Sequence, residues 1–568
     1  MIFFKRIKPN ENMKQVIRYL LLGVVFAASC SKTKTDILPG NQPTTVNLAP
    51  STIRIMLPAG AELMVNGDTL TNFLPLTEYA GAGGAPPTPV NPTPYFPATG
   101  KTAGPWYLPK RFLDGKGQAT VKLYSAPIGS GTMLSDSFQV TEDYAHPTDY
   151  YLTAIDPPPN STSIVTPVPR AITPASDPTH IRIRLVNLGE ITTLDPTNAK
   201  PLTLAFADGT PVSTVSSGIV NGKWSDYVEL PYGTYQFRVL ADGTPLQIPG
   251  TDPLLTTVRG ENDYTIQGGQ YYVPTFSFQP GGAYSIVVMY TRGCYQFGDE
   301  PLGTNCFTLQ TDISSSANLT YARVQGVNAA EQSGVHFWMD GADSSIGYGV
   351  ASGYASLIAG THDLKVTDAS GKVLTQKNIT VKGNDNLTAW IYPGTAGDSI
   401  VLVQNNMGGL KQSGVGGGED VTNTIYDPLK WHAIVQTRFL NLCPDLPYVT
   451  FTRNNGSLWL NDMFSTAAAA VNLQPGKPAD PSVMLYPYID LGMGSSGKIQ
   501  AYASQPSVVP GDRLKNVDDL EPAAFVRMPG YYYPDGAPGM ETGVYTVALI
   551  GRNITGQQPK MIVIKHNL

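Results

Sequence analysis

The sequence predicts an all-β protein made of tandem immunoglobulin-like antiparallel β-sandwiches. Apolar and polar residues alternate with a period of two along most of the chain, and a helical period is almost absent. The 57 Gly and 48 Pro residues supply frequent turns, and the 30 Tyr residues favour strands. One order of strands also occurs four times between Pro-rich or Gly-rich segments, so the 568 residues are expected to form several cores rather than one.

Each copy begins with an alternating strand and continues into a second strand that ends in a tight turn. The opening strands are expected at residues 53–57, 181–185, 321–324 and 434–439, and the turns at Asn66-Gly67, Asp208-Gly209, Asp340-Gly341 and Asn454-Asn455-Gly456. Asn-Gly and Asp-Gly favour type I′ turns because both residues tolerate positive φ.

A later strand and a closing strand pair complete each copy. The later strands are expected at 121–123, 235–239, 364–366 and 499–502. The closing pairs are 138–140 with 151–154, 276–278 with 284–288, 379–381 with 387–391, and 525–526 with 544–549. Roughly seven short strands per ~100 residues is typical of an immunoglobulin-like module.

The repeats and the segments between them give the expected domain boundaries. The four sandwiches are expected at residues 49–156, 179–312, 319–406 and 430–568, the last with a long insertion. Residues 156–178 and 408–427 are rich in Pro or Gly, a composition typical of linkers, and residues 31–48 form a polar tether.

Residues 13–30 have the layout of a bacterial lipoprotein signal. A basic start is followed by an apolar stretch at 19–28 and by small residues that lead into Cys30. That stretch is about half the ~20 residues of a bilayer-spanning helix, so residues 1–30 are expected to be a cleavable signal and Cys30 the lipidated residue. Met13 is a more usual signal start than Met1. The expected location is the outer membrane, lipid-anchored, on the cell surface or the periplasmic face.

Composition and motifs argue against several classes of function. Charged residues make up 14% of the chain, the net charge is −6 and no basic patch is visible, so nucleic acid is not an expected partner. The six His residues have no metal-ligand spacing, and the sequence has no Gly-x-Ser-x-Gly elbow, phosphate loop or dinucleotide fingerprint. We therefore expect no enzymatic activity, no cofactor and no metal site. Residues 261–263 and 384–386 are compatible with solvated turns or with calcium ligands.

Three cysteines follow Cys30. Cys294 and Cys306 lie in a Gly-rich stretch, and the oxidising conditions met by an exported protein make them a candidate disulfide. Their spacing fits no zinc motif. Cys443 is then expected to be a small buried apolar residue.

Aromatic residues near predicted turns are the candidate ligand contacts. They are Trp106, Tyr107, Trp224, Tyr227, Trp459, Tyr531, Tyr532 and Tyr533. Aromatic rings stack on sugars and anchor protein contacts, because they bury a large area at low entropic cost. The simpler interpretation is that most of them close the ends of the sandwiches. Glycan stacking and protein contact remain as alternatives.

Three copies end their first strand in an apolar-Asn-apolar step, at residues 186–188, 327–329 and 440–442. The fullest version is Arg-Phe-Leu-Asn-Leu-Cys-Pro-Asp-Leu-Pro-Tyr-Val-Thr-Phe at residues 438–451. It resembles the opening "R-V-V-N-A-S-P-D-A-P-x-V-D-V" of a domain-of-unknown-function family of immunoglobulin-like repeats in secreted and lipid-anchored proteins of Bacteroidota. The resemblance implies a β-sandwich at the cell envelope and carries no established activity.

Together these features predict a non-enzymatic, lipid-anchored cell-envelope protein whose tandem modules present a binding surface, with the ligand unassigned. The fourth copy, with its insertion and Tyr531–Tyr533, is the expected ligand position. One alternative is a glycan-binding accessory of a polysaccharide uptake system. Another is a structural or adhesive envelope protein, for which the partner would be another envelope protein.

Overall fold

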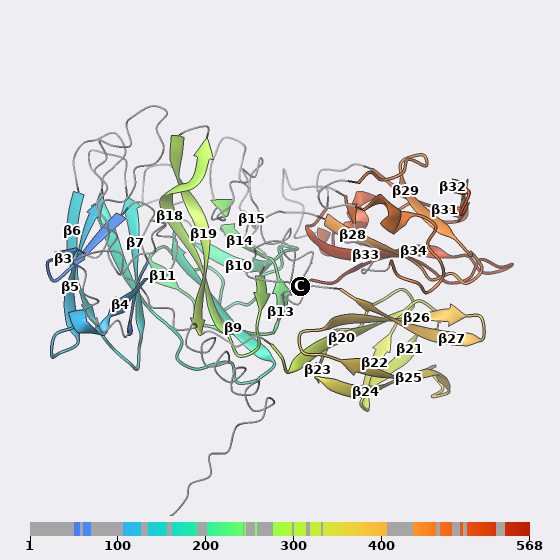
Figure 1. The fold of residues 1–568 in the computed structure, drawn as a ribbon, viewed down its shortest axis with the longest axis horizontal. Helices are drawn as coiled ribbons and strands as arrows, with labels where there is room; N and C mark the ends of the chain where they lie inside the picture. The colour runs from blue at the N-terminus through green and yellow to red at the C-terminus, as the bar shows by residue number, and fades with distance from the viewer. Residues whose placement is uncertain are drawn as a thin grey trace, which may run out of the picture. The chain divides into compact units, whose positions relative to one another are not determined.

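The structure is a computed structural model, and it describes most of the chain from residue 50 onward (Figure 1). The described residues are 50–56, 61–69, 106–125, 134–155, 162–189, 201–241, 244–245, 256–257, 276–297, 300–313, 318–330, 333–405, 435–461, 466–479, 489–491, 497–529 and 540–567. The predicted signal, Cys30 and the tether lie outside them. Strands dominate the described residues, and none of their helical segments is long and apolar enough to cross a membrane.

Module 3, residues 318–405, shows the strand order most completely. Its strands are β20 (Tyr321–Asn328), β21 (Val335–Met339), β22 (Ala342–Ile346), β23 (Ala355–Ile358), β24 (Gly360–Thr367), β25 (Val373–Val381), β26 (Asn386–Gly394) and β27 (Gly397–Gln404). They form two sheets, which we call sheet I (β23-β20-β26-β27) and sheet II (β22-β21-β24-β25). Within sheet I the first and seventh strands, β20 and β26, run parallel, and the other neighbours are antiparallel.

Module 1, residues 50–170, repeats this order strand for strand. Its strands are β1 (Pro50–Met56), β2 (Ala61–Val65), β3 (Asp68–Thr69), β4 (Trp106–Pro109), β5 (Gln118–Ser125), β6 (Leu134–Thr141), β7 (Thr148–Ile155) and β8 (Thr162–Pro169), with a 3₁₀ helix, η2, at Lys110–Phe112. Sheet I is β4-β1-β7-β8 and sheet II is β3-β2-β5-β6. Again the first and seventh strands are parallel.

Module 2, residues 180–313, is a more irregular version of the same sandwich. Its strands are β9 (His180–Leu188), β10 (Leu202–Phe206), β11 (Lys223–Trp224), β12 (Val228–Pro231), β13 (Gly233–Tyr235), β14 (Phe237–Ala241), β15 (Thr244–Pro245), β16 (Thr256–Thr257), β17 (Phe276–Phe278), β18 (Ala283–Phe297) and β19 (Glu300–Ile313). Sheet I is β11-β9-β18-β19-β16, with β12 also on β9. Sheet II is divided into β10-β14-β15 and β13-β17.

Module 4, residues 435–567, keeps the order with a shorter sheet II. Its strands are β28 (Val435–Asn441), β29 (Val449–Arg453), β30 (Ile489–Asp490), β31 (Ile499–Gln505), β32 (Val508–Arg513), β33 (Gly543–Ile550) and β34 (Lys560–Lys565), with 3₁₀ helices η4 (Ala467–Ala470) and η5 (Pro522–Phe525). Sheet I is β30-β28-β33-β34 and sheet II is β29-β31-β32. The first strand is again parallel to the long strand before the last, as in module 2.

The all-β fold of repeated sandwiches is therefore confirmed, but the strand order differs from that of an immunoglobulin domain. In an immunoglobulin constant domain the first and second strands share one sheet. Here they lie in opposite sheets in every module, and the first strand pairs with a parallel neighbour. The sheets are otherwise antiparallel, as predicted, apart from a second parallel pairing in module 2, between β16 and β19.

The closing part of each module also differs from the prediction. The two expected closing strands lie in opposite sheets, and a further strand that was not predicted completes sheet I, namely β8, β19, β27 or β34. β8 lies within the expected linker at residues 156–178. Phe525 is the last residue of η5 and Val526 follows it, so residues 525–526 form no strand. The type I′ turns are present at Asn66-Gly67 and Asp340-Gly341, where both residues have positive φ, whereas at Asp208-Gly209 only the glycine does.

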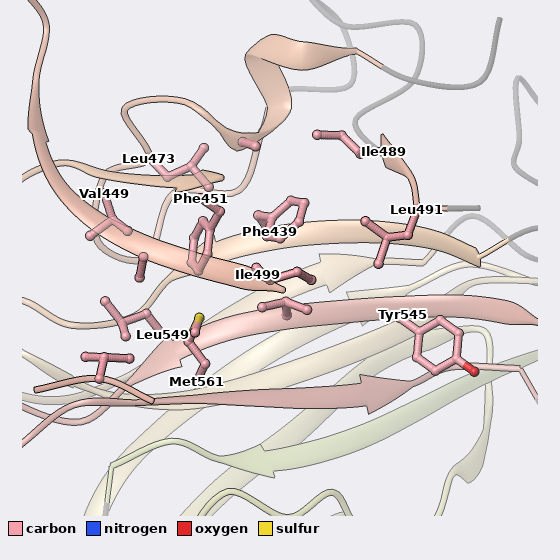
Figure 2. Packing of buried hydrophobic residues seen from close by; sticks show 14 of the residues in the cluster. Phe439, Val449, Phe451, Leu473, Ile489, Leu491, Ile499, Tyr545, Leu549 and Met561 are labelled. Atoms are coloured by element: carbon pink, nitrogen blue, oxygen red, sulfur yellow. The ribbon is translucent and has the colours of Figure 1, made fainter. Parts of the chain in front are cut away.

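Each sandwich encloses its own apolar core between sheets I and II. In module 4, Phe439 of β28 and Phe451 of β29 meet with ring centroids 4.9 Å apart, and Ile499, Leu549 and Met561 surround them (Figure 2). Burying each large apolar side chain contributes about 1.5–3 kcal/mol before the entropic cost of folding. The inward positions of the alternating strands supply these residues.

The Asn residue that ends the first strand is a buried clamp. The side-chain oxygens of Asn187, Asn328 and Asn441 each accept the backbone N–H two residues later, at 3.2, 3.1 and 3.0 Å. Their amide nitrogens donate to the carbonyls of Ile219, Ile346 and Leu473. Ile346 is the last residue of β22, and the other two lie between strands. The recurring motif therefore fixes the end of the first strand to a distant segment of the same module, which is an architectural role.

Replacing the best-placed clamp, Asn441, should destabilise module 4. Its amide also donates to the Leu446 carbonyl at 2.8 Å, and the side chain is 1% exposed. Asn441→Ala leaves buried backbone groups without partners, so we expect a loss of about 3 kcal/mol in the free energy of unfolding, measured by urea denaturation. The matched control is Asn378→Ala on the exposed side of β25, with an expected change within about 0.5 kcal/mol. Equal effects would contradict the clamp.

Candidate functional site

Modules 1 and 2 cover each other along the outer faces of their sheets I, where the described side chains at the centre of the contact are buried. Met56, Tyr151 and Val168 of module 1 form one buried cluster with Val186, Leu188 and Val287 of module 2, and Trp224 packs against it. These residues come from β1, β7 and β8 of module 1 and from β9 and β18 of module 2. We call this contact the 1–2 interface.

Charged side chains lie at the centre of the 1–2 interface. Arg54 of β1 donates through Nε to Asp149 of β7 at 2.7 Å and makes a second bond to the same carboxylate. It also reaches across to module 2, where it donates to the Thr311 carbonyl at 2.6 Å and to Asp312 Oδ1 at 2.9 Å. Arg54 is 1% exposed and both carboxylates are fully buried. Arg170 donates to Asp149 as well.

Module 2 completes this network around Asp312. The hydroxyl groups of Ser285 and Tyr227 donate to Asp312 Oδ2 at 2.5 and 2.8 Å, and Arg184 Nε donates to Ser285 at 2.7 Å. Burial alone would lower the pKa of Arg54, but its hydrogen bonds and charge contacts with Asp149, helped by Asp312, raise that pKa above its usual value. The two carboxylates thus offset much of the charge of the three arginines, Arg54, Arg170 and Arg184, within the interface.

Modules 3 and 4 cover the same face of sheet I in the same way. Val327, Ala329, Trp390 and Val403 of module 3 share a buried cluster with Leu440, Leu442, Ala548, Ile550 and Ile564 of module 4. Trp390 is the largest of these side chains and is fully buried. We call this contact the 3–4 interface.

A second polar network lies inside the 3–4 interface. Gln325 Nε2 of β20 lies 3.0 Å from His566 Nδ1, and Thr546 Oγ1 of β33 lies 2.7 Å from His566 Nε2. Asn405 donates to Thr388 Oγ1 of β26 at 2.9 Å. These five side chains are at most 3% exposed.

The two networks occupy equivalent positions of the strand ladders. Arg54 is paired with Asp149 in module 1, and the equivalent pair in module 3 is Gln325 with Thr388. In the same way, Arg184 is paired with Ser285 in module 2, and the equivalent pair in module 4 is Arg438 with Thr546. Arg170 and Asn405 each come directly after the eighth strand of their module. Asp312, near the end of β19, and His566, directly after β34, each lie two residues beyond the partner of the equivalent residues Ser285 and Thr546. Even the contacts correspond: Arg54 meets Asp312 where Gln325 meets His566. One interface design therefore occurs twice, once with charges and once nearly neutral.

Two of the predicted ligand contacts belong to this architecture. Trp224 is packed against the apolar part of the 1–2 interface. The Tyr227 hydroxyl is held by Asp312 and by the Ala171 N–H, at 2.8 and 3.0 Å, and Arg184 lies 4.6 Å from its ring. The pKa of Tyr227 is raised above 10, mainly by burial of the hydroxyl and secondly by the negative charge of Asp312. Neither side chain is presented to a ligand.

The other predicted aromatics are not gathered into one site. Trp459 packs against the core of module 4, with its ring 6.1 Å from Phe439. Tyr107 of β4 is 44% exposed, and the backbone of Trp106 is in the same strand while its side chain lies outside the described part. Tyr531, Tyr532 and Tyr533 also lie outside the described residues. Tyr107 is the one candidate that the described structure places at the surface.

The predicted disulfide receives no support from the strand register. Cys306 of β19 is opposite Met289 of β18, whereas Cys294 falls in an irregular step between Arg292 and Tyr295. Five residues along a strand span about 16 Å, beyond the Cα separation of a disulfide. The two side chains lie outside the described part, so the bridge stays a prediction. The burial of Cys443 is confirmed, and that burial raises the pKa of its thiol to about 11.

The outer face of sheet II in module 3 is the best candidate for a binding surface. Trp338 of β21 lies at its centre, half-buried, with its indole N–H 3.3 Å from Thr367 Oγ1. Cross-strand pairing places Asp343, Trp338, Lys365 and Gln376 in one row across the four strands. The row combines an indole with a carboxylate, an ammonium and an amide.

Neighbouring side chains hold this row in place. Lys365 Nζ lies 5.1 Å from the Trp338 ring centre, and the His336 ring lies 6.4 Å away on the same strand. His336 Nδ1 contacts Asp343 at 2.8 Å, and Gln376 donates to Asp363 at 2.9 Å. An ordered aromatic surface surrounded by donors and acceptors suits a hydroxylated ligand that also has an apolar face.

Sequence reasoning missed Trp338, although a signal was present. Within Val335-His336-Phe337-Trp338-Met339, the apolar residues at alternate positions point to the core, so Trp338 is at an outward position. A large aromatic at an outward position of a clean alternating strand is itself informative.

The comparisons with known proteins add no family and no relative. No family model matches this sequence, and a search of curated proteins finds no match. The resemblance of residues 438–451 to the Bacteroidota repeat family therefore stays an expectation. Among the described residues, no group of three or more His, Cys, Asp or Glu side chains is arranged to hold a metal ion.

Removing one charge from the 1–2 interface should be strongly destabilising. Asp149→Asn keeps the side-chain shape but leaves Arg54 and Arg170 buried with too little negative charge. We expect a loss of about 3–5 kcal/mol, measured by urea denaturation and thermal unfolding. The matched control is Asp143→Asn, a 49% exposed carboxylate of the same module, which should change stability by less than about 1 kcal/mol. A small effect at Asp149 would show that the network is not stabilised by its charges.

Proposed function

We propose that this protein is a non-enzymatic, lipid-anchored component of the cell envelope whose paired modules present a binding surface. Lipid on Cys30 attaches it to the outer membrane, and residues 31–48 connect the anchor to the modules. Either face of the outer membrane is compatible with this proposal.

The observation that carries the proposal is the pairing of modules. Both interfaces bury apolar residues around a hydrogen-bonded polar centre, so each pair should move as a single body. Sheet I is used for pairing, and its outer face is closed to a ligand. Sheet II of module 3 keeps an outward face with Trp338 at its centre, and this surface is our first candidate for ligand binding.

A glycan-binding accessory of a polysaccharide uptake system is the second candidate function, and Trp338 favours it. The apolar face of a sugar ring stacks on an indole, and its hydroxyl groups bond to carboxylate and amide groups. Asp343, Lys365 and Gln376 provide such groups in the same row. The Tyr531–Tyr533 segment, expected earlier to contact ligand, stays a further candidate outside the described residues.

Lipid anchoring is tested by fractionating cells that produce the Cys30→Ala variant. We expect the variant to move from the membrane fraction to the soluble fraction, because the acylated residue is lost. Cys443→Ala is the matched control, since that thiol is buried inside module 4 and should leave the location unchanged. Membrane association of Cys30→Ala would contradict lipid anchoring. Protease treatment of intact cells then distinguishes the cell surface from the periplasmic face.

Glycan binding is tested by affinity gel electrophoresis on a panel of envelope and plant polysaccharides. If one polysaccharide retards the protein, Trp338→Ala should weaken its affinity about 5- to 30-fold, because stacking on an aromatic is worth about 1–2 kcal/mol. Tyr144→Ala is the matched control, an aromatic of module 1 that is 64% exposed. Retardation that is unchanged in Trp338→Ala would exclude this face, and no retardation on any polysaccharide would count against the glycan function.

A further inference from the structure

The 3–4 interface has an imidazole where the 1–2 interface has a carboxylate. His566 occupies the position of Asp312 and is 1% exposed. Its Nδ1 lies 3.0 Å from the amide nitrogen of Gln325, which is a donor, so Nδ1 is the acceptor. The ring proton is then on Nε2 and is donated to Thr546 Oγ1 at 2.7 Å. This network assigns a neutral imidazole to His566.

Among the described residues of the elements packed against His566, the charged group nearest the ring is a cation, Arg438, which disfavours a second proton on the imidazole. Gln325 on β20, Thr388 on β26 and Thr546 on β33 are neutral. Arg438 on β28 is a cation, held by the Gln404 carbonyl at 2.6 Å and by Asn405 Oδ1 at 3.3 Å.

The charged groups next to His566 in the chain are already compensated. Lys565 contacts Glu541, and Arg527 lies 3.4 Å from the same carboxylate. Burial lowers the pKa of Lys565 to about 8. Glu541 is therefore shared between two cations and does not serve as a counter-ion for His566.

We propose that the 3–4 interface is an acid-sensitive joint, which opens when His566 takes up a proton, while the 1–2 interface stays closed. A protonated His566 would be a second cation beside Arg438 in a dry contact. A rotation of the Gln325 amide would restore a hydrogen bond, but it would bring no negative charge. In the 1–2 interface the position of His566 is occupied by the carboxylate of Asp312 and that of Gln325 by Arg54, which contacts both Asp149 and Asp312.

The direction of the effect follows from linkage. In the closed joint the pKa of His566 is held well below 6.5, mainly by burial of the ring and secondly by the positive charge of Arg438. In the open joint, water restores a value of about 6.5. The open form therefore binds more protons than the closed form. The fraction of molecules with an open 3–4 interface should not depend on pH well above ~6.5, and it should rise by up to about tenfold for each pH unit below that value. The proposal concerns regulation and does not depend on which ligand the protein binds.

Cysteine labelling at two matched positions tests the joint in the full mature chain. Val403→Cys lies in the 3–4 interface at 3% exposure, and Val168→Cys lies at the equivalent ladder position of the 1–2 interface at 0%. Each variant is treated with N-ethylmaleimide from pH 7.5 to pH 5, and labelling is read by peptide mass spectrometry. The ratio of the two rates cancels the pH dependence of the thiol itself.

We expect the Val403→Cys to Val168→Cys ratio to be nearly flat above pH ~7 and to rise about fivefold between pH ~6.5 and ~5.5. His566→Gln keeps the polar contacts without a titrating ring, and in that background the ratio should stay flat. A flat ratio in the parent chain, or the same rise with His566→Gln, would overturn the proposal. If His566→Gln fails to fold, the His566 ring of the parent chain is titrated by NMR instead. A ring that titrates near pH 6.5 while the 3–4 interface stays closed would also overturn the proposal.

Discussion

The structure depends on covering the outer face of sheet I. In a solitary sandwich one face of each sheet is wet, and its outward side chains are polar and solvated. Here the outward positions of sheet I are occupied by buried residues, so that all eight residues of β33 and all seven of β28 are buried. A module of this kind is therefore incomplete alone, and a second module supplies the missing surface. Four modules thus form two pairs, each with a continuous apolar layer between the partners.

The polar centre of each interface determines how two such faces meet. Apolar surfaces alone tolerate sliding, whereas Arg54 meets Asp149 and Asp312 together in only one register. Replacing such buried networks with apolar residues often costs little stability, so their contribution here is best understood as orientation. The 3–4 interface reaches the same orientation with amide, hydroxyl and imidazole groups. Equivalent geometry with different chemistry lets the two joints respond differently to the same solvent.

Much of the fold could be predicted from period-two alternation and turn residues, because both reflect local physics. The pairing of modules could not, because a polar residue at an outward position looks the same whether water or another module faces it. Arg54, Gln325 and Tyr227 are examples. β8 was missed because Pro167 and Pro169 resemble a linker, yet an edge strand tolerates proline. The Asn step marked the repeats correctly, while its role as a clamp required knowledge of where Ile219 and Leu473 lie.

Pairing also limits where a ligand can bind. Sheet I is closed in both interfaces, and Trp224 and Tyr227 are part of that closure. In modules 2 and 4, sheet II also carries buried polar residues, such as Arg238 at 1% and Thr452 at 0% exposure. Module 3 differs, because the four residues at the start of β22 are exposed and Trp338 lies beside them with an ordered set of polar neighbours. The paired architecture therefore directs the search for a ligand to sheet II of module 3. The reason is that this face stays exposed when the modules pair, and not that it is richer in aromatic residues than the other faces.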